Sequence, residues 1–212
     1  IESARNSDMS YIAVIPENPD AQLTSWLAEY GFEQIISIPA PEGLALNPVD
    51  LSSHLSDIVQ SCQISHFMGL STPFGRDILP RLAAEMDCPL VMDCMDLDLE
   101  THIAVTSQYS GKTLARIQVC GDTRVYGIRP NAVQPQKAPA PVEVIRICPD
   151  PAVPQDFKLI IDPEGPPDSD PGMVSLSEAD IIIAGGRGMK NKENFDLLFQ
   201  CAKRIKAAVG AS

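Results

Sequence analysis

Two short stretches of the chain have residue types and spacing that could bind phosphate. In the first, Ser110-Gly111-Lys112-Thr113 matches the last four residues of a nucleotide-triphosphate loop. Such a loop also needs a glycine five positions before Gly111, a strand before it and a helix after it. The upstream position holds Thr106, and the residues after Thr113 alternate as in a strand. The sequence therefore favours a structural strand over a phosphate cradle.

The second stretch is Gly185-Gly186-Arg187-Gly188, between an apolar run at 179–184 and a helical pattern that begins at Phe195. Glycines between a strand and a helix let a ligand approach the backbone, and Arg187 could then pair with a phosphate or a flavin edge. A glycine-rich turn with a solvated arginine is the alternative. Both interpretations stay open because the stretch lacks the GxGxxG fingerprint.

Other residues capable of chemistry are scattered and specify no site. The three histidines lie far apart in the sequence, and the six cysteines lack the paired CxxC spacing of zinc or redox sites. We predict no metal, and cysteines that are reduced and mostly buried. An acidic cluster is expected in a solvated loop, and no nucleophile-elbow motif points to hydrolysis. The cluster consists of Asp93, Asp96, Asp98 and Glu100.

The composition of the chain disfavours some classes of binding partner. The 212 residues include 16 Lys and Arg against 28 Asp and Glu, a formal charge of −12 that repels nucleic acid and anionic membranes. The apolar runs are shorter than the roughly 20 residues that span a bilayer, and no leader is recognisable. We expect a soluble, intracellular chain with protein or small-ligand partners and no membrane insertion. Residues 1–8 are interpreted as a loose tail or vector remnant.

Strand and helix patterns alternate along the first part of the chain and predict a mostly parallel sheet with flanking helices. Short strands are expected at 11–15, 35–38, 64–70 and 89–92, and helical stripes at 23–30, 51–62 and 78–86. Asn47-Pro48 marks the start of the second helix, and Pro80 is expected in the first turn of the third. Four later segments predict an antiparallel patch. They are 102–105, 114–119, 124–128 and 142–147.

The pattern predicts two domains. An α/β domain over 9–148 is followed by a Pro-rich connector over 149–175 and by the opening of a second domain over 176–212. The second domain contains one strand, the glycine turn and a helix traced from Phe195 to Val209. One such unit cannot bury both faces of its strand, so we expect this domain to be incomplete and its strand edge near Ile181 to promote self-association.

A third segment, Gly69–Gly75, could bind an anion at the carboxyl end of a parallel strand, as in a small-molecule enzyme. The structural interpretation is favoured, in which Ser71, Thr72 and Arg76 cap the following helix and supply charge to it.

Three stretches together resemble the alpha subunit of electron transfer flavoprotein. They are GRDILPRLAAEMDCPLVMD (75–93), SQYSGKTLARIQVCGDTRVYGIRPNAV (107–133) and LSEADIIIAGGRGMKNKENFDLLFQCAKRIKAAVGAS (176–212). The family pattern recurs in order: Tyr-x-Gly-x-x-Leu, a strand pair ending in Arg-Pro-x-Ala, Gly-Gly-Arg-Gly, and Ala-Ala-Val-Gly-Ala-Ser. The resemblance covers the chain from about Met9 onward and is weakest over the first sixty residues.

The resemblance implies an FAD-linked electron carrier rather than an enzyme. In the family, the first domain is a nucleotide-binding-like α/β fold without nucleotide that packs on the beta subunit, and the second is a Rossmann-like FAD domain. Arg187 and Ser212 match family FAD contacts, and Gly185, Gly186 and Gly188 complete the candidate cofactor site. The family's later FAD-binding segments lie beyond Ser212, so the site is expected to be incomplete in this chain.

The resemblance further implies partners and a compartment. Family members accept electrons from dehydrogenases such as acyl-CoA dehydrogenases, in fatty acid beta-oxidation, and pass them to a quinone oxidoreductase. The expected location is cytoplasmic, or the mitochondrial matrix in a eukaryote. The alternative is a shortened, flavin-free alpha-like protein that serves as a scaffold or binding module for a beta-like partner.

Overall fold

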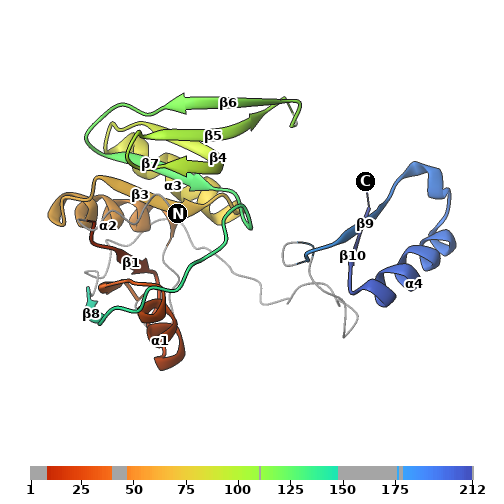
Figure 1. The fold of residues 1–212 in the computed structure, drawn as a ribbon, viewed down its shortest axis with the longest axis horizontal. Helices are drawn as coiled ribbons and strands as arrows, with labels where there is room; N and C mark the ends of the chain where they lie inside the picture. The colour runs from red at the N-terminus through yellow and green to blue at the C-terminus, as the bar shows by residue number, and fades with distance from the viewer. Residues whose placement is uncertain (1–8, 40–46, 110, 148–175, 177–178, 212) are drawn as a thin grey trace. The chain divides into compact units, whose positions relative to one another are not determined.

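Alternating strands and helices build the amino-terminal part of the chain (Figure 1), in a computed structural model that describes residues 9–39, 47–109, 111–147, 176 and 179–211. The chain divides into two units, Ile1–Leu159 and Ile160–Ser212, and each is described by itself. The tail at 1–8 and the connector at 149–175 lie outside the described residues. The first elements are β1 (Ile12–Ile15), α1 (Ala21–Glu29), β2 (Gln34–Ser37), α2 (Pro48–Ser61), β3 (His66–Leu70) and α3 (Pro73–Glu85).

Side-chain caps fix where the three helices of the first unit begin. Asp20 Oδ1 accepts the backbone N–H of Leu23 at 2.6 Å and starts α1. Asn47 caps α2 ahead of Pro48 at the first helical position, and Thr72 caps α3 ahead of Pro73. Each cap satisfies a backbone donor that the helix leaves unpaired, and proline at the first position loses no hydrogen bond. The Asn47-Pro48 start is confirmed.

Pro80 contradicts its predicted place in a first turn. It lies in the interior of α3, near the middle of Pro73–Glu85. Proline removes an N–H donor there and leaves the carbonyl oxygen of Arg76 without its helical partner. Pro80 and Arg76 are both exposed, so water can reach this side of the helix. The buried side, with Ile78, Leu79 and Leu82, is unaffected.

The strands described in the first unit form two sheets. The strand order of one is β1-β2-β8, with all pairs parallel, and that of the other is β3-β7-β4-β5-β6. In the second sheet β3, β7 and β4 are parallel, while β5 and β6 add antiparallel pairs; Figure 1 shows β6 at its upper edge. The fold is therefore α/β, mostly parallel with an antiparallel patch. The added strands are β4 (Leu90–Asp98), β5 (Ile103–Gln108), β6 (Thr113–Gln118), β7 (Arg124–Ile128) and β8 (Glu143–Arg146).

The antiparallel patch differs in membership from the prediction. It comprises β4, β5 and β6, whereas β7 pairs in parallel with β3 and β4, and β8 in parallel with β2. Strand direction depends on partners distant in the sequence, and local alternation carries no information about it.

Strand β4 includes three of the four acidic residues that were expected in a loop, and the fourth, Glu100, lies in the turn after the strand. Its first half pairs in parallel with β7 and its second half in antiparallel with β5, with a register shift in each ladder. Asp93 lies at the change, with a φ of 60°. Aspartate tolerates this left-handed conformation better than most residues, and the resulting bend redirects the strand. Asp93, Asp96 and Asp98 therefore belong to a strand, and their prediction as loop residues was wrong.

The core of the first unit has two parts. The larger packs α2 and α3 against strands of both sheets, and it includes Ile36, Leu55, Leu82 and Val125. The smaller gathers around Tyr126 and Cys94. Val125 and Tyr126 are neighbours on β7 and are both fully buried, since successive side chains of a strand point to opposite faces. Sheet β3-β7-β4 is thus covered on both faces.

The described residues of the second unit form a two-stranded parallel sheet and one α-helix. Its elements are β9 (Ile182–Gly185), the 3-10 turns η1 (Arg187–Met189) and η2 (Lys192–Asn194), α4 (Phe195–Ile205) and β10 (Ala208–Ala211). Lys206 adopts a φ of 54° and ends α4, and Ala207 N–H donates to Ala202 O. The chain then pairs with β9, so Val209 lies in a strand rather than in the helix where it was predicted. Within the described ranges, no helix is long and apolar enough to cross a membrane.

Candidate functional site

Gly185 ends β9 and lies beneath helix α4. A β-carbon at this position would lie 2.6 Å from Leu198 Cδ1 and 3.0 Å from a ring carbon of Phe195. Both distances are shorter than normal packing allows, so the absence of a side chain lets the helix approach the strand. Gly185 supports the candidate site by packing, and its buried position separates it from the exposed residues that follow.

The loop after Gly185 is held by its own hydrogen bonds. Met189 N–H donates to Gly186 O at 2.9 Å, and Lys190 N–H donates to Arg187 O at 3.2 Å. Asn194 donates from its side chain to Met189 O at 2.6 Å. These hydrogen bonds pair several backbone groups of the loop with one another or with Asn194. The charged side chains of the loop stay exposed.

The side chains of this loop surround an open hollow of about 290 Å³. Three of its lining residues are cations. The lining comprises Gly186, Arg187, Met189, Lys190, Asn191, Lys192 and Phe195. A β-carbon at Gly188 would meet no atom within 4 Å, so that glycine borders open space. Gly188 is not part of the lining, in which Gly186 is the glycine. The hollow thus offers positive charge beside one glycine, which suits an anionic ligand.

Four of the five predicted cofactor residues are neighbours in the chain, and the structure places them at the end of β9 and in the loop that follows it. Gly185, Gly186, Arg187 and Gly188 are consecutive at the carboxyl end of β9, and Gly185 pairs with Ala211 of the parallel strand β10. Ligands of parallel α/β sheets bind at the carboxyl ends of the strands. Ser212 lies outside the described residues. Lys190 and Lys192, which line the hollow beside Arg187, were not among the predicted residues, although basic residues near a glycine turn are visible in the sequence.

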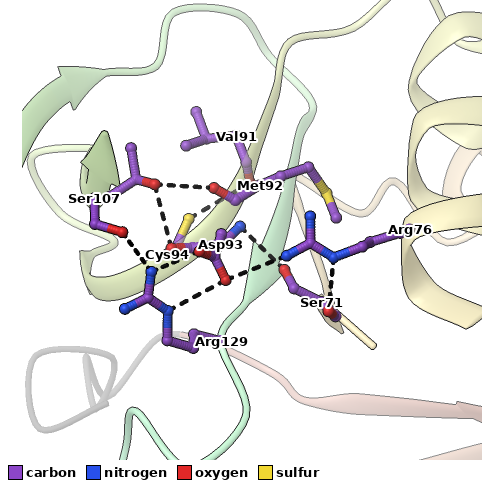
Figure 2. A network of polar contacts seen from close by, with 9 residues as sticks. Ser71, Arg76, Val91, Met92, Asp93, Cys94, Ser107 and Arg129 are labelled. Atoms are coloured by element: carbon purple, nitrogen blue, oxygen red, sulfur yellow. Dashed lines mark hydrogen bonds and ion pairs between the residues drawn. The ribbon is translucent and has the colours of Figure 1, made fainter. Parts of the chain in front are cut away.

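A second polar cluster lies in the first unit, at the carboxyl ends of β3 and β7 (Figure 2). Arg129 donates to both oxygens of Asp93, from Nε to Oδ1 at 3.2 Å and from Nη2 to Oδ2 at 2.6 Å. Arg129 Nη2 also donates to Ser107 Oγ at 2.5 Å. On the other side, Arg76 Nη2 lies 3.5 Å from Asp93 Oδ1, and Asp93 N–H donates to Ser71 Oγ at 3.0 Å. We call these five residues the Asp93 cluster.

The electrostatics of the Asp93 cluster suit a structural link better than acid–base chemistry. Hydrogen bonds from Arg129 hold the pKa of Asp93 below its ordinary value, with Arg76 adding to the effect, so the carboxylate stays ionised near neutral pH. Next to it, burial and the Asp93 charge raise the pKa of the Cys94 thiol to about 11. Such a thiol stays protonated and is a poor nucleophile.

The polar groups of the segment at 69–75 form hydrogen bonds within helix α3 and with the Asp93 cluster. Thr72 Oγ1 accepts the N–H of Gly75, Ser71 O accepts Arg76 Nε at 3.1 Å, and Ser71 Oγ accepts Asp93 N–H. The capping interpretation is confirmed for Thr72, whereas Ser71 and Arg76 contact Asp93 and each other. The side chains that could have bound an anion here already have partners.

The other phosphate-like stretch is a hairpin. Lys112 N–H donates to Tyr109 O in the turn, and Thr113 opens β6 by pairing with Gln108 of β5. No helix follows within this hairpin. The prediction of a strand residue is confirmed at Thr113, the first residue of β6, and is wrong at Lys112, which lies in the turn.

Two histidines that are distant in the sequence meet in the fold. His66 Nε2 lies 3.3 Å from His102 Nδ1, and the His66 ring stacks on Tyr126 at 6.2 Å. Burial lowers the pKa of His66, and the charges of Arg124 and His102 lower it further. Across the described residues, no group of three or more His, Cys, Asp or Glu side chains could hold a metal ion.

Comparisons with known proteins fit this geometry. The electron transfer flavoprotein domain matches residues 2–150, and the electron transfer flavoprotein FAD-binding domain matches residues 175–212. The chain belongs to the electron transfer flavoprotein family, and within it to the alpha subunits.

Named relatives support the same family. The chain is 28% identical to the electron transfer flavoprotein subunit alpha of Bacillus subtilis (strain 168), over 98% of this chain and 63% of that protein. It is 30% identical to the mitochondrial subunit alpha of Oryza sativa subsp. indica, over 70% of this chain and 42% of that one. Protein FixB of Azotobacter vinelandii is 33% identical, over 74% of this chain and 45% of that protein. The chain thus spans between 42 and 63% of these relatives.

Proposed function

We propose that this chain acts in FAD-linked electron transfer in the role of an alpha subunit, together with a beta subunit. The observation that carries the proposal is the hollow at the carboxyl end of β9, where Arg187 and bare glycine backbone lie within the segment that matches an FAD-binding domain. The acidic chain concentrates positive charge at this hollow, which is what an anionic cofactor needs.

The residues present fit part of an FAD site. Arg187 is exposed and, among the described residues, has no hydrogen bond or ion pair from its guanidinium to another side chain. When bound, FAD supplies the redox chemistry through its isoalloxazine ring, and the protein supplies binding, orientation and electrostatics. The guanidinium of Arg187 would stabilise negative charge on the phosphate or on the ring edge, and Gly186 and Gly188 would let the ligand approach the backbone.

The donors and acceptors of electrons are proposed from family likeness. Dehydrogenases, with acyl-CoA dehydrogenases among them, would deliver electrons, and a quinone oxidoreductase would accept them. The chain itself would act as a carrier subunit, as the family likeness implies. The Asp93 cluster fits this role, because its carboxylate is held ionised by Arg129 and the neighbouring Cys94 thiol has a raised pKa.

Equilibrium dialysis of the purified chain against FAD, read from its visible absorption band, tests the proposal. We expect FAD to bind, and R187A to bind it at least tenfold more weakly. R204A is the matched control, because Arg204 is an exposed arginine in the last turn of α4, at the other end of the helix from the hollow. A chain that ignores FAD but binds a beta subunit would contradict the proposal and favour the flavin-free scaffold.

A further inference from the structure

Three cations of the loop after β9 share one hollow and form no ion pair among the described residues. Arg187, Lys190 and Lys192 are exposed and line the same space, on a chain whose formal charge is −12. Two acids, Glu193 and Asp196, lie in the same segment. Among the described residues, however, no ion pair joins either acid to these cations. The hollow therefore has a local excess of positive charge, and this attracts an anion.

The backbone of the loop brings these cations to the same hollow. Lys190 has a φ of 63° and a ψ of −48°, a region that residues with side chains rarely occupy. Asn191 N–H donates to Met189 O at 2.8 Å, and the side chain of Asn194 donates to the same oxygen. The chain turns sharply at Lys190 as a result, and both lysines line the space that Arg187 borders.

The size of the hollow limits what it can hold. Its volume is about 290 Å³, just below the roughly 300–1,000 Å³ of sites that enclose a complete small ligand. The hollow therefore suits part of a dinucleotide. The charged part fits best, because lysine binds phosphate as a point charge and arginine binds it through paired N–H donors.

We propose that Lys190 and Lys192 form, with Arg187, a subsite for the diphosphate of a nucleotide ligand. Its assignment to the diphosphate of FAD rests on the proposed function above, whereas the diphosphate chemistry rests on the hollow alone. In this subsite Lys190 and Lys192 each donate to a phosphate oxygen, and Gly186 leaves room for the ligand beside the backbone.

The test removes the two lysines together and compares them with two cations outside the hollow. K190A/K192A is the test variant. K203A/R204A is the control, since Lys203 and Arg204 are exposed in the last turn of α4 and their loss changes the net charge equally. Circular dichroism and gel filtration verify that both variants fold. The probe is ADP, titrated by isothermal calorimetry at low and moderate salt.

We expect K190A/K192A to weaken ADP binding about tenfold or more, and the control to weaken it less than about threefold. Added salt should reduce ADP binding by the unmodified chain, because the contacts are charge-assisted and exposed. Failure of ADP to bind the unmodified chain would overturn the proposal. So would equal losses in the two variants, because a general charge effect would then explain the result.

FAD and riboflavin separate this inference from the proposed function. Riboflavin lacks the diphosphate, so K190A/K192A should weaken FAD binding and leave riboflavin binding unchanged. If the chain binds ADP through the two lysines but binds neither flavin, the diphosphate subsite stands and the FAD proposal fails. If FAD binds and K190A/K192A binds it as well as the unmodified chain does, the FAD proposal stands and the subsite is wrong.

Discussion

Arg129 holds Asp93 through both oxygens of its carboxylate, at 3.2 and 2.6 Å, although the two residues are 36 positions apart in the sequence. The contact joins the end of β7 to the bend in β4, where the sheet changes from parallel to antiparallel pairing. Asp93 therefore adds a side-chain contact at the point where the two halves of the sheet meet along β4, and Arg76 adds a weaker contact from helix α3.

Removing the charge of Asp93 should destabilise the first unit. Asparagine tolerates the φ of 60° at this position but leaves Arg129 and Arg76 without a carboxylate between them. We expect D93N to lower the free energy of unfolding by about 1–3 kcal/mol, measured by urea denaturation. D77N is the control, because Asp77 pairs with Arg81 on the exposed face of α3 and such pairs contribute less than about 1 kcal/mol. Equal effects of D93N and D77N would show that the Asp93 cluster contributes no more than a surface pair.

The Asp93 cluster shows which parts of a fold local sequence patterns miss. Helices were predictable because their caps and apolar spacing lie within a few residues, as at Asn47-Pro48. The continuation of β4 through Asp93 was not, since its conformation depends on partners from β3, β5 and β7. Strand direction failed for the same reason: β8 gains its parallel partner β2 from a segment more than one hundred residues earlier.

The candidate cofactor site was partly visible in the sequence. Three glycines around Arg187 marked the loop, because strand–glycine–helix order is local. The roles within the loop were not visible. Gly185 is buried against α4, whereas the neighbouring Gly186 borders the hollow. Lys190 and Lys192 line the hollow because the chain turns sharply at Lys190. No residue type in that segment predicts such a turn.

His66 should make the stability of the first unit depend on pH. Burial, Arg124 and His102 hold its pKa below the ordinary value of 6.5, so the unfolded chain binds a proton at higher pH than the folded chain does. The stability that neutral His66 contributes is fully present above the unfolded pKa, and it is lost as pH falls from about 6.5 through the lower folded pKa. H66Q should reduce this loss. Urea denaturation of both proteins between pH 7.5 and pH 5 measures this difference. If the free energy of unfolding fell equally with pH in H66Q and in the unmodified chain, the prediction would be contradicted.

The second unit should associate with itself. Several of its large apolar side chains are exposed, Leu197 by 63% and Ile182 by 51%, and among the described strands β9 pairs with β10 alone. An unpaired strand edge flanked by apolar side chains favours contact with another copy. We expect the mass measured by light scattering to rise with concentration and I182K to reduce the rise. A monomer that persists at high concentration would count against this expectation.

A methyl group should have opposite consequences at two glycines of the same loop. In G185A the new β-carbon would press on Leu198 and Phe195, and overpacking of this kind costs about 1–3 kcal/mol. Helix α4 and strand β9 should then exchange their amide hydrogens faster, as measured by mass spectrometry. In G188A the methyl group meets no neighbour within 4 Å, so exchange should stay close to that of the unmodified chain. If G188A loosened α4 as much as G185A does, the close approach at Gly185 would not be what holds the helix on the strand. Because Gly188 directly follows Arg187, a loss of FAD binding in G188A without faster exchange would instead place the ligand against this exposed part of the backbone.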